Sequence, residues 1–415
     1  MKLAVIGGGS TYTPELVDGI ARLAGEVKVT EVILVDPDEG RLSVVGPFSA
    51  RIMRAHGHPA TLRWTTSLDD GLDGAGAVLL QLRIGGQAAR HHDETWPLEY
   101  GCIGQETTGA GGFAKALRTI PVVLDIAERA RARAADGAWI IDFTNPVGIV
   151  TRALLDAGHR AIGLCNVAIG CQRQFAALLG VPPAEVMLDH VGLNHLTWER
   201  AAVVDGTDRL PALIAAHGEQ IAGHTALPVS VIHEIGAVPS YYLHYFYAHD
   251  AVVAAQRGAA TRAQEVAELE RRLLAMYADP ALDRKPDLLG ERGGAFYSEA
   301  AVALLASLVN DTRDTQVVNV RNAGTLPFLP DEAVIGSGGA APAPVAPLPA
   351  LMRGLVGQVS GYEELAVDAA LRGGRHRVAG ALLAHPLVGQ FDLAGQLADR
   401  LIAENLDYLP WAASR

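Results

Sequence analysis

The first 36 residues constrain the fold of this chain more than any other stretch. The apolar run Lys2–Ile6 is long enough for a buried strand, and a helical repeat of apolar residues begins at Leu16. A second strand is expected at Val32–Val35, directly before Asp36. Three successive glycines separate the first strand from the helix, namely Gly7, Gly8 and Gly9. This order predicts a βαβ unit with a glycine turn, as in dinucleotide-binding domains.

The glycine turn and Asp36 together suit NAD. Backbone N–H groups in such a turn approach a pyrophosphate closely, and a carboxylate after the second strand can hold a ribose diol. Ser10, Thr11 and Thr13 offer hydroxyls that could cap the helix, and Pro14 suits its first turn. The match to G-x-G-x-x-G is incomplete, because Tyr12 stands where the third glycine belongs. A structural glycine turn in another α/β protein is the alternative interpretation.

Strand and helix patterns alternate through the first 165 residues. Further strands are expected at Ala77–Leu82, Ala138–Phe143 and Ala161–Leu164, with a long helix within Ala116–Ala135. This order predicts an α/β fold with a Rossmann-type, doubly wound parallel sheet. After about residue 170, helices and less regular segments dominate. We therefore predict an NAD-binding domain over residues 1–170 and a mixed α+β catalytic and substrate domain over 171–415.

Later segments give weaker indications of secondary structure. Apolar helices are expected near Ala300–Val309 and at Leu393–Glu404, the latter being the last. Leu82–Gly112, dense in glycine and polar residues, predicts a long functional loop. Gly336–Pro349 resembles a linker in composition, but few residues follow it. We interpret that stretch as a loop or edge excursion inside the second domain.

Composition argues against several classes of partner. The net charge is −12 and the basic residues are scattered, so nucleic acid is not an expected partner. The chain has no apolar span long enough to cross a membrane, and its apolar start is too short for a signal sequence. We therefore expect a soluble, cytoplasmic protein. Three cysteines cannot form a disulfide framework in 415 residues, so free thiols or a metal thiolate are expected.

Candidate site residues follow predicted strands, whose carboxyl ends face the ligand crevice in parallel sheets. Asn145 is such a residue, with an Asx-type turn as the alternative. Cys165 is another; with His195 it could hold a divalent transition metal, although a buried core thiol is the commoner case. Pro239–Tyr247 packs five aromatic residues into nine positions, which predicts either a core stripe or a tyrosine base in a cleft.

Together these motifs resemble glycoside hydrolase family 4, the NAD-dependent glycosidases. The resemblance extends over nearly the whole chain, and its most specific segments are GQETTG and the pair GLCN and GLNH. Other matching segments are IGGGSTYTPEL, LVDPD, RIGGQAARHHDE, FTNPVGIVT, YYLHYFY, ERGGAFYS and VNVRNAG. The family is an exception to the two-carboxylate scheme of most glycosidases.

The resemblance implies a fold like lactate and malate dehydrogenases, with NAD⁺ on the N-terminal domain and a divalent metal, usually Mn²⁺. Its metal ligands map onto Cys165 and His195, and its base onto Tyr242, with Tyr241 as a one-residue alternative. Asn166 follows the metal cysteine, as in the 6-phospho-β-glucosidases, and we count it with the catalytic residues. Four further residues are assigned to the substrate, namely Arg90, Asn145, Arg292 and Arg321.

The implied reaction begins with oxidation of the sugar at C3. Hydride transfer to NAD⁺ creates a C3 ketone that acidifies the C2 proton, and the metal stabilises the enediolate as a Lewis acid. Tyr242 then removes the C2 proton, and the aglycone leaves from C1. Water adds at C1, the proton returns to C2, and NADH reduces C3. The cofactor is therefore regenerated in each cycle.

One position departs from the family pattern. His244 stands two residues after Tyr242, where β-specific members often carry Arg. Guanidinium suits phosphate better than imidazole does, so this difference weakens the case for a 6-phosphate. Arg292 and Arg321 could still supply the positive charge. The predicted substrate is a β-glucoside or its 6-phosphate, taken by a homodimer or homotetramer. An unphosphorylated sugar, net NAD-dependent dehydrogenation and a non-catalytic NAD-binding regulator are the alternatives.

Overall fold

A computed structural model describes residues 1–294, 296–312, 316–337 and 345–413. The chain forms two compact units, each made of three segments. Unit 1 consists of Met1–His91, Thr119–Asn166 and Thr261–Asp314. Unit 2 consists of His92–Arg118, Val167–Ala260 and Thr315–Arg415. The chain passes from one unit to the other within helices α4 (Gly86–Glu99) and α5 (Gly109–Arg133).

Unit 1 contains a parallel sheet with the order β6-β5-β4-β1-β2-β3 in its described part. Its strands are β1 (Lys2–Ile6), β2 (Glu31–Val35), β3 (Thr61–Thr65), β4 (Ala77–Leu80), β5 (Trp139–Asp142) and β6 (Ala161–Gly163). The strand order reverses between β1 and β4, so the chain has the topological switch point of a doubly wound sheet. The strand ends at Leu80, Asp142 and Gly163 lie within two residues of the predicted ones.

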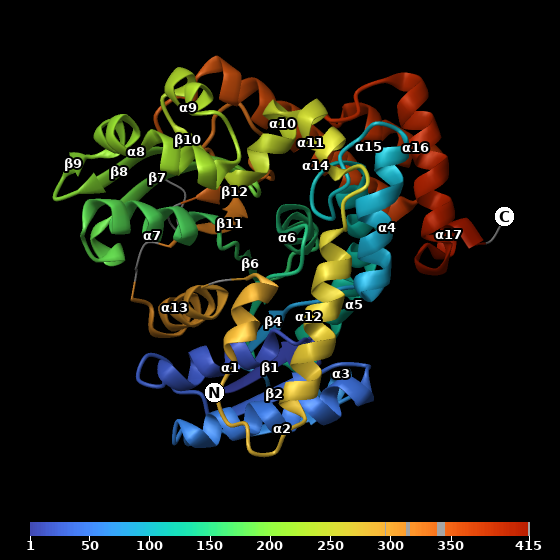
Figure 1. The fold of residues 1–415 in the computed structure, drawn as a ribbon. Coiled ribbons are helices and arrows are strands. Elements are labelled where there is room, and N and C mark those ends of the chain that lie inside the picture. Colours follow the sequence, from blue (N-terminus) through green and yellow to red (C-terminus); the bar gives the residue numbers. More distant parts are fainter. Residues whose placement is uncertain (295, 313–315, 338–344, 414–415) are drawn as a thin grey trace. The chain divides into compact units, whose positions relative to one another are not determined.

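The helices of unit 1 come from both early and late parts of the chain. They are α1 (Thr13–Arg22), α2 (Glu39–Ala55), α3 (Leu68–Leu72), α6 (Val147–Asp156), α12 (Arg262–Tyr277) and α13 (Tyr297–Asn310), with the 3₁₀ turn η3 (Asp287–Arg292). In Figure 1, α1 and α2 lie beside β1 and β2, and α12 runs past α2. Tyr277 of α12 stacks on Phe48 of α2 at 4.3 Å between ring centroids. This packing explains why residues 261–314 join unit 1.

The predicted boundary between residues 170 and 171 lies near one point where the chain passes from unit 1 to unit 2, between Asn166 and Val167. As a division into functional domains it stays a prediction. Of the linker-like stretch Gly336–Pro349, residues 338–344 lie outside the described residues, and both flanks belong to unit 2.

Unit 2 contains an antiparallel ladder in the order β10-β8-β7-β12-β11, with β9 paired to β8. Its strands are β7 (Met187–Leu193), β8 (Leu196–Val204), β9 (Thr207–Asp208), β10 (Val238–Pro239), β11 (Val318–Arg321) and β12 (Val334–Ser337). Its helices are α7 (Val167–Leu179), α8 (Leu210–Thr225), α9 (Val229–Ile235), α10 (His244–Tyr247), α11 (His249–Gln256), α14 (Ala350–Arg372), α15 (Arg375–Ala384), α16 (Phe391–Glu404) and α17 (Pro410–Ala413). Three 3₁₀ turns complete it, η1 (Pro183–Glu185), η2 (Tyr241–Leu243) and η4 (Leu406–Tyr408).

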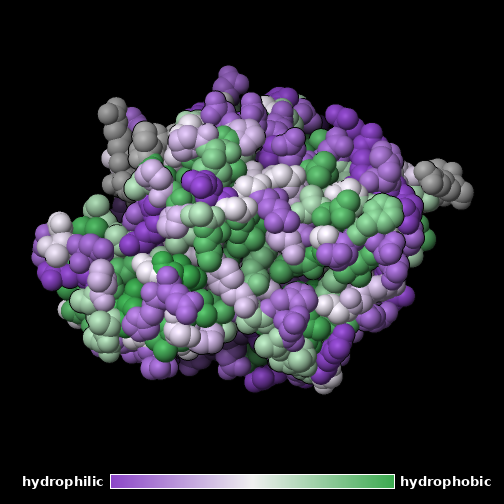
Figure 2. All heavy atoms as spheres, turned by 90° about the horizontal axis from the view of Figure 1, so that it is seen from above, coloured by the Kyte–Doolittle hydropathy of each residue, from purple (hydrophilic) through white to green (hydrophobic). Residues whose placement is uncertain are grey.

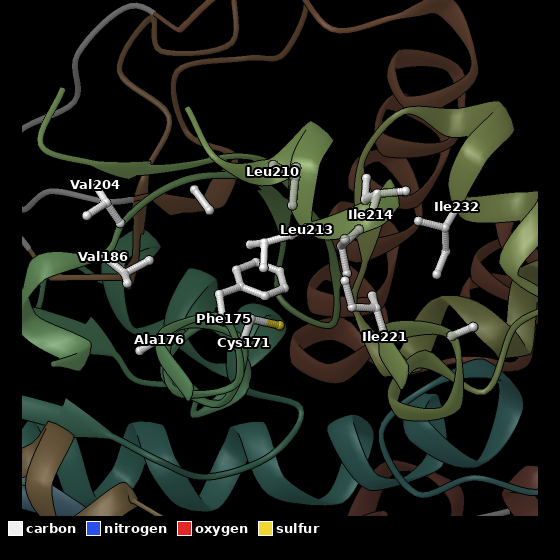
Figure 3. Close-up of a cluster of buried hydrophobic side chains, with 13 residues drawn as sticks. Cys171, Phe175, Ala176, Val186, Val204, Leu210, Leu213, Ile214, Ile221 and Ile232 are labelled. Atoms are coloured by element: carbon white, nitrogen blue, oxygen red, sulfur yellow. The ribbon is translucent and has the colours of Figure 1, made fainter. Parts of the chain in front are cut away.

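A buried apolar cluster joins α7, α8 and α9 to β8 in unit 2. Figure 3 shows Cys171 and Phe175 of α7 facing Leu213 of α8. The surface seen in Figure 2 intersperses hydrophobic residues among hydrophilic ones, which is ordinary for folded proteins. Within the described ranges, no helix combines the length and the apolar composition needed to cross a membrane.

Two expectations about secondary structure were wrong. The stretch Leu82–Gly112 is not one long loop, because α4 occupies 14 of its residues and α5 begins at Gly109. That helix buries Arg90, Asp93 and Glu94 alongside Trp96, so its inward face lacks the apolar repeat that identifies a helix in a sequence. The helix ending at Glu404 is not the last, since α17 follows it.

Asp142, at the end of β5, makes the stability of unit 1 depend on pH. Burial raises the pKa of this carboxyl to about 8, although hydrogen bonds from Thr144 and Thr151 act in the opposite direction. Its Oδ1 accepts from the Thr144 N–H at 2.8 Å. Between an unfolded pKa near 3.9 and the folded pKa, the unfolded chain holds fewer protons, so stability is lost as pH rises.

Asp142→Asn should remove this dependence, because the amide keeps the shape of the carboxyl and cannot ionise. The free energy of unfolding of the wild type should fall by up to about 1.4 kcal/mol per pH unit inside that window through this group. Urea unfolding at several pH values from 5 to 8 measures the slope. Asp125→Asn, which changes an exposed carboxylate of α5, should keep the wild-type slope. Equal slopes for Asp142→Asn and the wild type would contradict the assignment.

Candidate cofactor and active site

The glycine turn of unit 1 is closely packed between strands. Gly7 has φ +88°, and a Cβ at this position would lie 2.6 Å from the carbonyl oxygen of Gln81. A Cβ on Gly8 would lie 2.6 Å from Cβ of Leu34. Both N–H groups donate to the Val35 carbonyl, at 2.8 and 2.9 Å. Larger residues would therefore push β1 away from its neighbours, β2 and β4.

Asp36 lies against this turn at the end of β2. Its Oδ2 accepts from the Gly9 N–H and its Oδ1 from the Asp38 N–H, each at 3.0 Å. Burial raises the pKa of the carboxyl, against the two backbone hydrogen bonds. Each oxygen of a carboxylate has about two lone-pair sites, so both can accept a further hydroxyl. The position fits a ribose diol.

The sequence suggested that hydroxyls near the turn cap helix α1. In the structure they do not. The helix begins at Thr13 after Tyr12, whose side chain accepts no capping hydrogen bond, and Pro14 stands in the first turn as predicted. Ser10 Oγ accepts from the Tyr12 N–H at 3.2 Å, and Thr11 Oγ1 accepts from Arg292 Nε at 2.7 Å. Thr11 therefore binds an arginine instead of the helix terminus.

Tyr12, at the position of the missing third glycine, packs under a later segment of unit 1. Its hydroxyl donates to the Gly294 carbonyl at 2.7 Å. A Cβ on Gly294 would lie 2.9 Å from the Tyr12 ring. The tyrosine thus fixes the segment that follows Arg292, which accounts for the incomplete G-x-G-x-x-G pattern.

A buried carboxylate, Glu270 of α12, organises the charges beside the turn. Its oxygens lie 3.0 Å from Arg292 Nη2 and 3.4 Å from Arg41 Nη1. Burial alone would raise the pKa of Glu270, but the charges of Arg292 and Arg41 outweigh it and lower that pKa. Gln87 Nε2 donates to the same carboxylate at 3.3 Å. Glu270 and Arg41 were not predicted from the sequence, because neither lies in a recognisable motif.

The strand ends of unit 1 carry the other predicted residues. Asn145 follows β5, and its Oδ1 is buried without a hydrogen-bond partner within the described residues. Cys165 and Asn166 follow β6 and are half-buried, and Arg90 is buried on α4. Because Asp142 pairs with Gly163, Asn145 and Cys165 follow adjacent strands. The unpartnered amide oxygen of Asn145 suits contact with a ligand.

In unit 2, His195 and Tyr242 form a stacked pair. Their ring centroids lie 3.6 Å apart and their planes differ by 7°. His195, in the turn between β7 and β8, has φ +62°, and its Nδ1 is buried without a hydrogen-bond partner among the described residues. Burial lowers its pKa to about 3, and the charge of Lys115 acts in the same direction. The imidazole is therefore neutral, as a metal ligand must be.

A buried ion pair contributes to the electrostatics around His195. Lys115 Nζ lies 2.6 Å from Glu106 Oε2, and both side chains are less than one-tenth exposed. The Glu106 charge opposes the effect of Lys115 on His195. Glu106 lies in the GQETTG segment of the family resemblance, but its pairing with Lys115 was not predicted, because burial of a lysine is not visible in a sequence.

His244 and Arg321 have partners within unit 2. The His244 ring is buried and hydrogen-bonds through Nδ1 to the Tyr241 carbonyl. Burial lowers its pKa, so it does not supply the positive charge of an arginine. Arg321 Nη1 donates to the Glu332 carbonyl at 3.1 Å.

Across the described ranges, no three His, Cys, Asp or Glu side chains gather into a metal-binding group, and none of the three cysteines forms a disulfide. The predicted ligands Cys165 and His195 belong to unit 1 and unit 2 respectively. A thiolate and an imidazole would leave most positions of a divalent cation open to oxygens from outside the protein.

The switch-point sheet, the glycine turn and Asp36 define a Rossmann-type α/β protein. The chain belongs to family 4 of the glycosyl hydrolases: the model of the family 4 glycosyl hydrolase matches residues 2–181, and that of the family's C-terminal domain matches residues 190–388. The resemblance drawn from the sequence is thus confirmed. Malate dehydrogenase from Salinibacter ruber, with a TM-score of 0.55 and 16% identity, confirms the predicted likeness of fold.

Relatives match along the whole chain. A probable 6-phospho-β-glucosidase of Bacillus subtilis is 37% identical over 99% of this chain and 97% of its own. A 6-phospho-β-glucosidase of Escherichia coli is 35% identical over 99% and 96%. A phospho-α-glucosidase of Clostridium acetobutylicum is 27% identical over 98% of each chain.

A solved structure of the 6-phospho-β-glucosidase of Thermotoga maritima contains manganese, NAD⁺ and glucose-6-phosphate. It has a TM-score of 0.90 and 31% identity, covering 98% of this chain and 99% of that one. The cofactors inferred from the sequence are thus those found in this relative.

Proposed function

We propose that this chain is a 6-phospho-β-glucosidase that requires NAD⁺ and a divalent cation, in the first instance Mn²⁺. The observation that carries the β-specificity is the difference in identity: two 6-phospho-β-glucosidases reach 37% and 35%, and the phospho-α-glucosidase reaches 27%. Asn166, directly after Cys165, supports the same assignment through the family resemblance of the GLCN segment.

The cofactor roles are assigned to two groups of residues, one for the dinucleotide and one for the metal. We assign the dinucleotide to Gly7, Gly8, Gly9, Ser10, Thr11 and Asp36, and the metal to Cys165 and His195. The fit of His195 is supported by its neutral imidazole and its unpartnered Nδ1. When bound, NAD⁺ would accept a hydride from the sugar C3, and the cation would act as a Lewis acid on the sugar oxygens.

Tyr242 is our candidate for the base that removes the C2 proton. Its stacking on His195 holds the phenol ring in a fixed orientation beside a proposed metal ligand. Tyr241, the alternative, is 47% exposed and lies edge-on to Tyr242. We therefore favour Tyr242, whose position is set by packing.

Substrate binding is assigned to Asn145, Arg90, Arg292 and Arg321. The buried, unpartnered oxygen of Asn145 supports a contact with a sugar hydroxyl. The phosphate would need a guanidinium, because His244 is uncharged in its buried position. Arg292 donates to Thr11 and Glu270, and Arg90, Arg292 and Arg321 all stay candidates for the phosphate.

Hydrolysis of p-nitrophenyl β-glucoside 6-phosphate tests the function. With NAD⁺ and Mn²⁺ present, kcat/KM should exceed that for the unphosphorylated glucoside by on the order of 10²-fold or more, because a site with polar groups for a phosphate leaves them unpaired without it. Removing NAD⁺ or adding a chelator should abolish activity. Equal rates on both glucosides would favour the unphosphorylated alternative, and stoichiometric accumulation of NADH would indicate a net dehydrogenase.

A homo-oligomer, dimer or tetramer, and a cytoplasmic location belong to the proposal as well. Exposed apolar side chains on the C-terminal helices of unit 2, among them Phe391, support self-association.

A further inference from the structure

Two side chains of opposite charge, Asp36 and Arg41, meet at Gly9 in unit 1. A Cβ on Gly9 would lie 2.9 Å from Cγ of Asp36 and 3.1 Å from Cβ of Arg41. The Gly9 N–H donates to Asp36, while the Gly9 carbonyl accepts from Arg41 Nε at 2.9 Å. An acidic and a basic side chain therefore flank the same residue of the turn, at the end of β2 where a ribose would bind.

Glu270 balances the charge at this place. Arg41 and Arg292 share its carboxylate, at 3.4 and 3.0 Å, and Asp36 adds the second negative charge. Two carboxylates thus lie beside these two guanidinium groups, and the charge of Arg83 also acts on Arg292. Glu270 is 8% exposed, so solvent screens its charge little. Arg41 has Nε bound to the Gly9 carbonyl and Nη1 bound to Glu270, and its guanidinium is therefore held along the turn.

We propose that Glu270 is a positioning residue that makes the dinucleotide site select NAD⁺ over NADP⁺, by holding and neutralising Arg41. The inference rests on the proposed NAD⁺ site. NADP⁺ differs from NAD⁺ by a phosphate on the ribose 2′-oxygen, and sites that accept it place an arginine there. Asp36 repels that phosphate, and Arg41 cannot compensate while Glu270 binds it. Glu270 would thus act on cofactor choice through Arg41.

The test measures dissociation constants of NAD⁺ and NADP⁺ by isothermal titration calorimetry on the full chain, without substrate. Glu270→Gln keeps a hydrogen-bond acceptor but removes the charge, so Arg41 becomes available to a phosphate. The ratio of the NADP⁺ constant to the NAD⁺ constant should fall by about tenfold, the size expected for one partly screened charge acting on a dianion. A loosened turn would weaken both cofactors alike and leave this ratio unchanged.

Glu268→Gln is the matched control. This carboxylate lies on the same helix α12, but it is exposed and pairs with Arg271 at 2.6 Å. The variant loses the same charge, and its ratio should equal that of the wild type. In the double variant Glu270→Gln with Arg41→Met, the gain in NADP⁺ affinity should disappear, because the arginine that provides it is gone.

Arg41→Met alone tests the inference independently of the stability of Glu270→Gln. With Glu270 in place, losing Arg41 removes a positive charge and leaves Glu270 paired with Arg292, so the ratio of the NADP⁺ constant to the NAD⁺ constant should not fall below that of the wild type. A fall of this ratio in Arg41→Met would overturn the inference, as would an unchanged ratio in a folded Glu270→Gln that still binds NAD⁺. Failure of the wild type to bind NAD⁺ would instead overturn the proposed function, and this inference with it.

Discussion

Tyr242→Phe should slow exchange of solvent deuterium into C2 of the sugar by roughly 10²–10⁴, the usual cost of removing a general base. The phenyl ring keeps the stacking on His195, so the surrounding packing should survive. Hydride transfer at C3 should remain possible, because it does not involve the hydroxyl. The measurement is NMR of the product formed in D₂O, with NAD⁺ and Mn²⁺ present.

The wild type should incorporate deuterium at C2, because elimination breaks the C2–H bond whereas displacement at C1 leaves it intact. Tyr241→Phe is the matched control: it removes a hydroxyl from the neighbouring, more exposed tyrosine and should exchange as the wild type does. If Tyr241→Phe lost exchange and Tyr242→Phe retained it, the base would be Tyr241. A wild-type product without deuterium would argue against the elimination mechanism or indicate a proton shielded from solvent.

Cys165→Ser should lower Mn²⁺ affinity by at least about 10–100-fold, the loss seen when even indirect partners of a metal site are removed. A hydroxyl is a far weaker ligand than a thiolate. Because Cys165 is half-buried in the loop after β6, the fold should be retained. Activity titrated with Mn²⁺, together with direct Mn²⁺ binding by electron paramagnetic resonance, measures the effect.

Cys171→Ala provides the control for this experiment. Cys171 is buried in the apolar cluster of α7 and α8, where Figure 3 shows its sulfur beside Phe175. Removing the sulfur should cost stability, on the order of 1 kcal/mol, and leave Mn²⁺ affinity unchanged. Equal losses of Mn²⁺ affinity in both variants would show that the assigned ligand is wrong.

Parts of the fold were predictable because local sequence defines them. β1, the glycine turn, α1 and β2 were expected within a few residues, since a buried strand is a continuous apolar run and the helix repeats its apolar residues. The family resemblance also came from contiguous motifs, and it was confirmed by both family models. By contrast, α4 was missed, because its buried face carries Arg90 and Asp93, whose burial depends on partners elsewhere in the chain.

The βαβ start, the Rossmann-type sheet and the family were predictable from the sequence, because these follow from short-range patterns. The tertiary structure alone decided that residues 261–314 return to unit 1 and place Glu270 beside Arg41 and Arg292. It also decided that His195 stacks on Tyr242. Such contacts join residues tens to hundreds of positions apart, and burial gives them their strength by removing the water that would otherwise screen charges and satisfy polar atoms.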